Sequence, residues 1–195
     1  FDEVLEVKRP LIEMEARIRK LELEGLVVMA PRKGAKVASI TERDLNDVLE
    51  VRKGMEVLAI SLACERITKE EMEHLEKIEA HFQTLIESDN LTELAEVDVE
   101  FHDTIYQATN NKRLVQLLNN LREQMYRYRL EYIKDEDKRQ ILIVEHEHIL
   151  AAIKARNIAE AKNAAREHID NQEITVSKNI KEQEDIMPVR GRGRR

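Results

Sequence analysis

The chain has 195 residues, of which 42% are hydrophobic and 36% charged, with only five Gly, three Pro and no Trp. So few helix-breaking residues favour a helical protein and argue against a β-sandwich, a β-barrel or a collagen-like chain. A single cysteine, Cys64, excludes a disulfide framework and a zinc module built from cysteines. The sequence contains no apolar run long enough to span a bilayer and no secretory signal pattern, so we expect a cytoplasmic protein with no membrane partner.

The net charge of −7 is distributed unevenly along the chain. Residues 1–40 contain 8 Lys and Arg against 7 Asp and Glu, whereas residues 41–187 contain 20 against 32. The last segment, 188–195, contains four Arg and reads as a basic tail or an expression tag. Because an acidic body repels a polyanion, any contact with nucleic acid is expected at the ends of the chain.

The first 40 residues read as a helix followed by a β-hairpin. The stretch ARIRKLELEG has apolar residues at helical spacing and stops at Gly25, a residue type common at helix C-termini. Two Val-containing runs, LVVMA and AKVASI, flank a turn that places Arg32 and Lys33 at the tip of the hairpin. A helix that leads into a hairpin with a cationic tip is typical of the second half of a winged helix-turn-helix, although basic turns also occur in ordinary hairpins.

From Thr41 onward the hydrophobic pattern predicts an all-α bundle of about six helices. Thr41 and the capping box Thr68–Glu71 mark two helix starts. The remaining helices are expected from about Thr92 to Thr109, from Leu114 through Met125, over Ile143–Ile153 and from about Ala159, with breaks at 88–90, 110–111 and 134–139.

Four residues that can bind metals fall on the apolar faces of three of these helices. Asp98 and His102 lie one turn apart, while His146 and His168 share the apolar stripes of the last two helices; His148 points elsewhere and is expected at the surface. Buried imidazoles and carboxylates need partners, and one divalent cation would satisfy all four groups. Spacing alone also allows ordinary core histidines bonded to the backbone.

The sequence lacks the usual motifs of catalysis. It has no Gly-rich phosphate loop, no Ser nucleophile elbow and no HExxH, and Cys64 lies among apolar residues as a buried thiol would. We therefore do not expect an enzyme. Two alternatives stay open: a metal-dependent helix-bundle hydrolase, and a non-catalytic structural bundle whose histidines are core residues.

The chain resembles the FadR-type branch of the GntR transcriptional regulators, whose C-terminal effector-binding domain is called the FCD domain. The resemblance rests on four segments: KLELEGLVVMAPRKGAKVASIT, VLEVRKGMEVLAISLACERIT, DVEFHDTIYQATNNKRL and EHEHILAAIKARNIAEAKNAAREHI. Together they cover most of residues 19–170. It implies a mainly α protein with an N-terminal winged helix-turn-helix and a C-terminal all-α FCD-type bundle.

The resemblance assigns a ligand set to this chain. It implies that Asp98, His102, His146 and His168 hold a divalent metal, with zinc first and nickel or manganese as alternatives. It also implies an effector that is a small organic acid, and matches Arg52 to an Arg that could pair with the effector carboxylate. From the residues alone, an ion pair of Arg52 with Glu56 at the surface or an interface is an equal alternative. Asn111 matches a family Asn that we expect to cap a turn.

The N-terminal zone departs from the family pattern. The residues before ARIRKL are too few for the first two helices of a winged helix-turn-helix, so we expect this domain to be incomplete in the sequence. The resemblance implies DNA contact only for Arg19, Lys20, Arg32, Lys33 and Gly34. We expect the wing tip to lie near the minor groove and the helix end to lie near phosphates.

These observations predict three parts and one function. Residues 1–40 form the DNA-binding domain, residues 41–187 the effector- and metal-binding domain, and residues 188–195 the tail. We expect a homodimeric, ligand-responsive transcriptional regulator that binds operator DNA and a small carboxylate effector.

Overall fold

The computed structural model describes residues 2–87 and 90–186. The chain divides into two compact units, Phe1–Ile40 and Thr41–Arg195. The basic tail at 188–195 lies outside the described residues. The predicted mainly α fold is confirmed, with eight helices and two short strands in the part of the chain that the structure describes.

The first unit consists of helix α1 (Asp2–Leu23) and the antiparallel hairpin of β1 (Val27–Ala30) and β2 (Gly34–Val37). The helix ends at Leu23, two residues before the predicted stop at Gly25, whose φ of 71° is the left-handed conformation that glycine adopts without strain. The hairpin is also where the sequence predicts it, with Val27 opposite Val37 and the turn at Arg32 and Lys33. Among the described residues of this unit, a single helix precedes the hairpin.

Over its described residues, the second unit is a bundle of seven helices. They are α2 (Glu42–Arg66), α3 (Lys69–Leu85), α4 (Leu91–Ala108), α5 (Lys112–Asn119), α6 (Arg122–Ile133), α7 (Glu136–Lys154) and α8 (Ile158–Ile186). The prediction of about six was one too few, because the segment after Leu114 divides into α5 and α6. The amide of Asn120 closes the end of α5 on carbonyls of that helix, and the chain then turns at Leu121.

Side-chain caps fix where these helices begin. The Thr41 hydroxyl accepts a hydrogen bond from the amide of Asp44, and Thr68 and Glu71 form both halves of the predicted capping box. Asn111 caps α5 by accepting from the amide of Leu114, as expected. The break at 134–139 is shorter than predicted, because Asp135 caps α7 and the helix restarts at Glu136.

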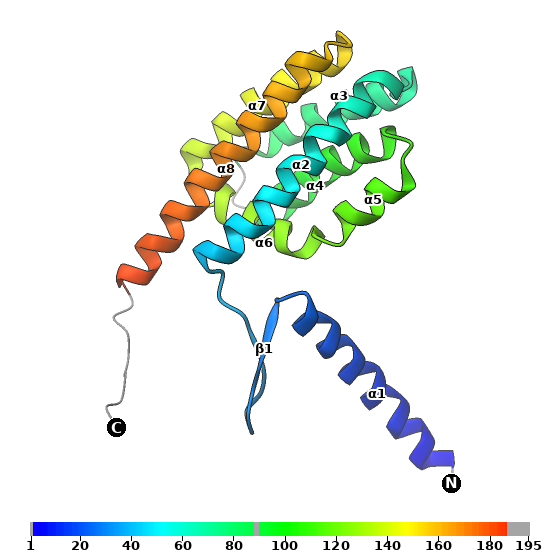
Figure 1. Cartoon of the computed structure of the whole chain (residues 1–195), viewed down its shortest axis with the longest axis vertical. Coiled ribbons are helices and arrows are strands. Elements are labelled where there is room, and N and C mark those ends of the chain that lie inside the picture. The colour runs from blue at the N-terminus through cyan, green and yellow to red at the C-terminus, as the bar shows by residue number, and fades with distance from the viewer. Residues whose placement is uncertain (1, 88–89, 187–195) are drawn as a thin grey trace. The chain divides into compact units, whose positions relative to one another are not determined.

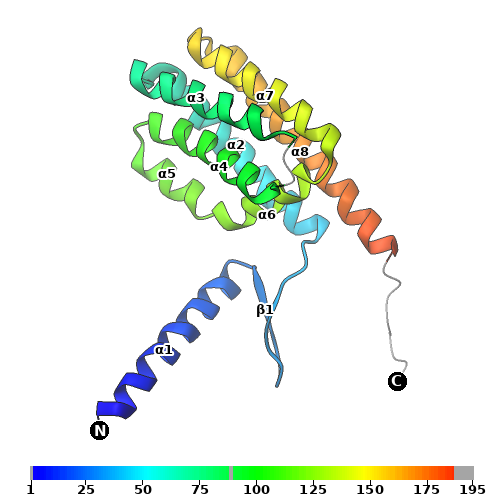
Figure 2. The ribbon, with the colours of Figure 1, turned by 180° about the vertical axis from the view of Figure 1, so that it is seen from behind.

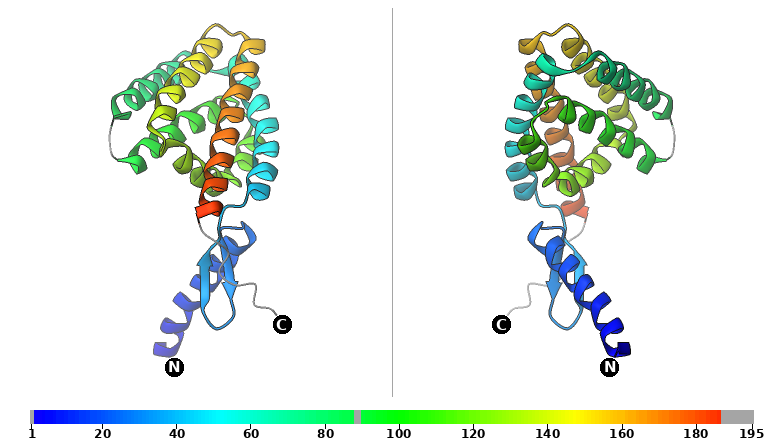
Figure 3. Two further views of the ribbon diagram at one scale, coloured as in Figure 1. Left: turned by 90° about the vertical axis from the view of Figure 1, so that its left-hand side faces the viewer. Right: turned by 90° about the vertical axis from the view of Figure 1, so that its right-hand side faces the viewer.

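Helix α4 packs against four other helices of the bundle, α2, α3, α5 and α6. Helices α2 and α8 lie side by side along one flank with α7 next to α8 (Figure 1, Figure 3). Figure 2 shows α3, α4 and α5 in succession on the opposite flank, and α4 also packs against α2 and α6. The core includes fully buried side chains such as Phe82, Phe101 and Ile169. Cys64 is buried as predicted, and its thiol donates to the Ala152 carbonyl at 3.7 Å.

None of the helices within residues 2–87 and 90–186 has the length and hydropathy that crossing a membrane requires.

Candidate metal centre

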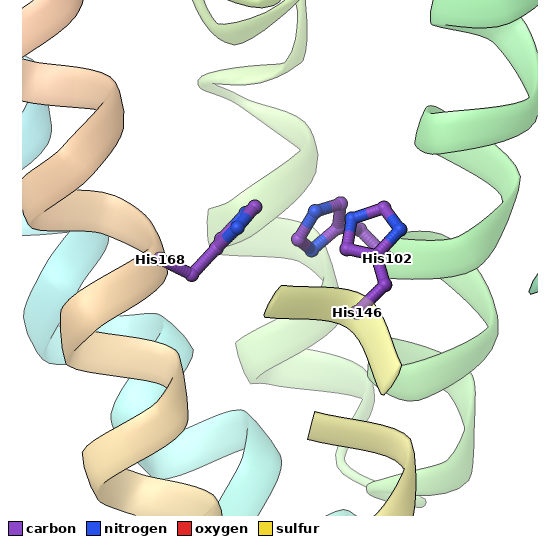
Figure 4. Close-up of side chains that lie close together, drawn as sticks. All are labelled: His102, His146 and His168. Carbon is purple, nitrogen blue, oxygen red and sulfur yellow. The ribbon is translucent and has the colours of Figure 1, made fainter. Parts of the chain in front are cut away.

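Three histidines from three helices converge inside the bundle (Figure 4). His102 on α4, His146 on α7 and His168 on α8 each offer one ring nitrogen, and these three atoms lie within 4.8 Å of one another. The three residues are at most 3% exposed. The sequence pattern predicts the same three histidines as a group, and the structure brings them together.

Asp98 lies at the same place, but with a partner that the sequence did not indicate. Its Oδ1 is 3.1 Å from Nε2 of His146, while its Oδ2 forms an ion pair with Nε of Arg129 on α6. The contact with His146 lacks hydrogen-bond geometry. Among the described residues, Asp98 Oδ1 and Nε2 of both His102 and His146 are buried atoms without a hydrogen-bond partner.

A glutamate lies near the Nδ1 atom of each imidazole. His146 Nδ1 is 3.0 Å from Glu79 Oε2, and His168 Nδ1 is 2.8 Å from Glu145 Oε2. His102 Nδ1 faces Glu56 at a longer 3.8 Å. The Nε2 atoms are thereby left for the centre of the cluster, except at His168, where the Gln172 amide lies 3.1 Å from Nε2.

Arg52 is buried beside this cluster, with 1% of its surface exposed. Its Nε donates to Glu56 at 3.1 Å and its Nη1 donates to Gln172 at 2.6 Å. The ion pair with Glu56 therefore exists, but it is interior and not at the surface. Arg52 Nη2 is buried and finds no hydrogen-bond partner within the described part of the chain.

Burial shapes the protonation of these groups. Desolvation lowers the pKa of His102 and lowers the pKa of His168 well below its usual value, which favours the neutral imidazole that a metal requires. Burial also raises the pKa of Glu145 to about 7. Burial alone would raise the pKa of Glu56, but His102 and Arg52 outweigh it and lower that pKa to about 2.

Sequence reasoning missed four polar residues of the centre: Glu79, Glu145, Arg129 and Gln172. Each occupies a helix position between buried apolar residues; Glu79, for example, follows Leu75 by four residues and precedes Phe82 by three. A polar residue at such a position in an apolar stripe is a signal in the sequence that could have identified all four.

The other predicted residues lie outside the cluster. His148 is exposed as expected and contacts Glu160 at 2.7 Å. The five residues proposed for DNA contact are exposed in the first unit: Arg19, Lys20, Arg32, Lys33 and Gly34.

A groove of about 640 Å³ opens on the outer surface of α3, α4 and α6. Its lining includes Asp103 and Arg122, which form a surface ion pair at 2.9 Å. The groove contains none of the clustered histidines, so we do not assign the centre to it.

Comparison with known proteins shows the family and the fold of the chain. The family model of the FCD domain matches residues 47–171. The chain is 31% identical over 166 residues to GlaR, an HTH-type transcriptional repressor of Escherichia coli, covering 78% of this chain and 73% of GlaR. It spans about two thirds of the length of the curated relatives that it matches.

Two solved structures share the fold. McbR/YncC of E. coli superposes with a TM-score of 0.77 at 18% identity, covering 85% of this chain and 83% of that one. The metal-free FCD domain of TM0439 superposes with a TM-score of 0.63 at 20% identity, covering 74% and 99%. On the family match and the relatives, the chain belongs to the FCD-domain family of GntR-type transcriptional regulators.

Proposed function

We propose that this protein is a ligand-responsive transcriptional regulator whose helical unit binds a divalent metal and a small organic acid. The N-terminal 40 residues would supply part of a winged helix-turn-helix for operator DNA. The observation that carries the proposal is the convergence of buried donor atoms from Asp98, His102 and His146 that have no hydrogen-bond partner in the described chain. Buried polar atoms are normally satisfied, so a shared ligand is the simplest account of them.

The donor set fits a divalent cation. Asp98, His102, His146 and His168 would hold it, and the 3.1 Å between Asp98 Oδ1 and His146 Nε2 matches the about 3 Å expected of two neighbouring ligands on one zinc ion. Three nitrogens and one oxygen suit zinc, which we propose first, and also nickel or manganese.

The charge of the centre supports the same assignment. Four buried carboxylates, from Glu56, Glu79, Asp98 and Glu145, contact the histidines or two buried guanidinium groups, from Arg52 and Arg129. If the imidazoles are neutral and all four carboxylates are ionised, as a bound cation would favour, two negative charges are left over, and a divalent cation would balance them.

The effector would bind between this centre and Arg52. A bound metal supplies a Lewis-acidic position that accepts an effector carboxylate oxygen. Arg52 Nη2 is buried and free within the described chain, so it can donate a charge-assisted hydrogen bond to the same carboxylate. Arg129 adds a second buried positive charge close by. We therefore propose a small carboxylate as the effector class.

DNA contact is assigned to the first unit. Arg32, Lys33 and Gly34 form the exposed tip of the hairpin, which would approach the minor groove, and Arg19 and Lys20 at the end of α1 would approach phosphates. We propose that a homodimer binds a palindromic operator and that the effector changes operator affinity by roughly 1–3 kcal/mol. A cytoplasmic location stays a prediction.

We propose no catalytic role. A hydrolase would need a carboxylate free to activate water, whereas the glutamates of this centre contact imidazole nitrogens or Arg52. The relatives that match the chain are named as transcriptional regulators. The two alternatives are tested by the same experiment as the proposal.

The test is metal stoichiometry followed by operator binding. We expect one equivalent of metal per chain, lost in Asp98→Ala and His146→Ala and retained in His148→Ala, because His148 lies on the same helix but faces solvent. Operator gel shifts should then respond to a panel of small carboxylic acids. The absence of stoichiometric metal would support a purely structural bundle, and turnover of esters or phosphates that His146→Ala abolishes would support the hydrolase.

A further inference from the structure

We infer that three glutamates, Glu56, Glu79 and Glu145, are positioning residues that set the tautomer and the metal affinity of the three histidines. The inference rests on the proposed metal site and goes beyond its ligands. Each glutamate comes from a different helix, α2, α3 and α7, and each is at most 9% exposed. A glutamate therefore lies beside Nδ1 of each histidine, within hydrogen-bond distance at His146 and His168 and at 3.8 Å at His102.

The geometry indicates what each carboxylate does. A neutral imidazole carries its proton on one nitrogen and its lone pair on the other. A carboxylate that accepts a hydrogen bond from Nδ1–H fixes that tautomer, so the lone pair stays on Nε2 and the ring cannot rotate freely. Glu79 at 3.0 Å and Glu145 at 2.8 Å are placed to accept in this way. The Nε2 atom of His146, which faces Asp98, is then the metal-binding nitrogen.

The three glutamates differ in how many partners other than the histidine their carboxylate oxygens contact. Glu79 meets His146 with one oxygen, and its other oxygen receives only a long 3.4 Å hydrogen bond from Gln83. Glu145 divides its oxygens between His168 and the Asn171 amide at 2.6 Å. Glu56 accepts from Arg52 and from the Tyr106 hydroxyl, and stands farther from His102.

Glu79 is thus the clearest residue to change. Glu79→Gln keeps the size of the side chain, removes its negative charge and offers an amide N–H that favours the wrong His146 tautomer. A matched control exists on the same pair of helices: Glu76, one turn earlier on α3, pairs with Lys154 on α7 at the surface at 2.6 Å. Glu76→Gln removes a carboxylate between α3 and α7 without touching the centre.

The experiment measures metal affinity directly. The full chain is titrated with Co²⁺, whose absorption reports ligation, and Zn²⁺ affinity is then obtained by competition. We expect Glu79→Gln to weaken metal binding by about 10- to 100-fold, the usual effect of losing such a partner, and Glu76→Gln to change it less than about two-fold. Circular dichroism and the melting temperature of the metal-free proteins show whether each variant folds.

A second readout separates positioning from packing. In metal-free protein, the ¹⁵N chemical shifts of the His146 ring should show a proton on Nδ1, and Glu79→Gln should shift the population toward Nε2–H. If Glu79→Gln does not fold, Glu145→Gln is measured in its place at His168, with the same expected fall in affinity. Metal affinity or a tautomer unchanged in a folded variant would overturn the inference alone. Failure of the unaltered protein to bind Co²⁺ or Zn²⁺ would overturn the proposed metal site and the inference with it.

Discussion

Asp98 presents its two carboxylate oxygens to two different partners: Oδ2 pairs with Arg129, while Oδ1 faces Nε2 of His146 at 3.1 Å. One aspartate thereby joins α4 to α6 and to α7. Because Asp98 is fully buried and Arg129 is 4% exposed, neither charge can turn to water. The same carboxylate stabilises the fold through Arg129 and, in the proposed function, binds metal beside His146. Experiments can separate these two roles.

Replacing Asp98 by Asn should destabilise the metal-free protein. The change leaves the Arg129 guanidinium buried without its counter-charge, which costs about 3–5 kcal/mol in the free energy of unfolding. Urea denaturation in the presence of a chelator measures this. Asp103→Asn is the matched control, because Asp103 pairs with Arg122 between the same two helices at the surface, and it should cost less than about 1 kcal/mol. Equal losses in the two variants would contradict a buried role for the Asp98–Arg129 pair.

Gln172 should compete with the metal for His168. Its side-chain amide lies 3.1 Å from Nε2 of His168, the nitrogen that would otherwise bind metal, and Arg52 holds the oxygen of the same amide. Gln172→Leu removes this competitor, so we expect tighter zinc binding, by about ten-fold if the hydrogen bond removed is worth about 1.4 kcal/mol. Zinc competition titration checks the change, and weaker binding would mean that Gln172 supports the site.

The pH dependence of stability should report Glu145. Burial raises the pKa of Glu145 to about 7, so between pH 4.5 and 7 the folded protein holds a proton that the unfolded chain has released. This group therefore makes the metal-free protein less stable as the pH rises through that range. His102 and His168, whose pKa values burial lowers, act in the opposite direction.

Comparing Glu145→Gln with the unaltered protein isolates the contribution of Glu145. Since glutamine never ionises, we expect the variant to gain stability relative to the unaltered protein as the pH rises from 4.5 to 7. Chemical denaturation at several pH values, with chelator present, measures the difference. A difference that does not change with pH would contradict the raised pKa. The same variant should bind zinc more weakly. Glu145→Gln is therefore expected to raise the relative stability of the metal-free protein near pH 7 and to lower its affinity for zinc.

Arg52 should determine the response to the effector more than the binding of metal. Lysine at position 52 keeps the positive charge near Glu56 but does not offer the fork of donors that pairs with a carboxylate. We expect Arg52→Lys to bind zinc within about three-fold of the unaltered protein and to bind carboxylates at least about ten-fold more weakly. Zinc competition titration measures the affinity for zinc. Thermal shift of the zinc-loaded protein with a panel of carboxylic acids measures the binding of carboxylates. An unchanged response to the acids would place the effector elsewhere.

The helical fold could be predicted from sequence because its signals are local. The caps at Thr41 and Thr68 and the hairpin turn at Arg32 depend on neighbouring residues only. The division between α5 and α6 was missed because Leu114 and Met125 continue one apolar pattern across a bend of two residues.

The four proposed ligands of the candidate centre could be predicted from the sequence, but their hydrogen-bond and ion-pair partners could not. The spacing of Asp98, His102, His146 and His168 selects the correct helix faces, and the structure brings those side chains together. Their partners follow from how the helices pack, which spacing within one helix does not contain: Glu79 reaches His146 across 67 positions. Arg52 likewise reaches Gln172 across 120 positions.

The hairpin tip should contribute to DNA affinity through charge. Arg32 and Lys33 are exposed at the turn, where both can neutralise phosphates. Removing one cation that neutralises a phosphate should lower the slope of log affinity against log salt by about 0.9. We therefore expect Arg32→Ala and Lys33→Ala each to weaken binding of duplex DNA and to flatten its salt dependence, as measured by fluorescence anisotropy. Arg43→Ala, which removes an exposed cation from α2, should change neither quantity. If all three variants behave alike, the hairpin has no specific part in DNA contact.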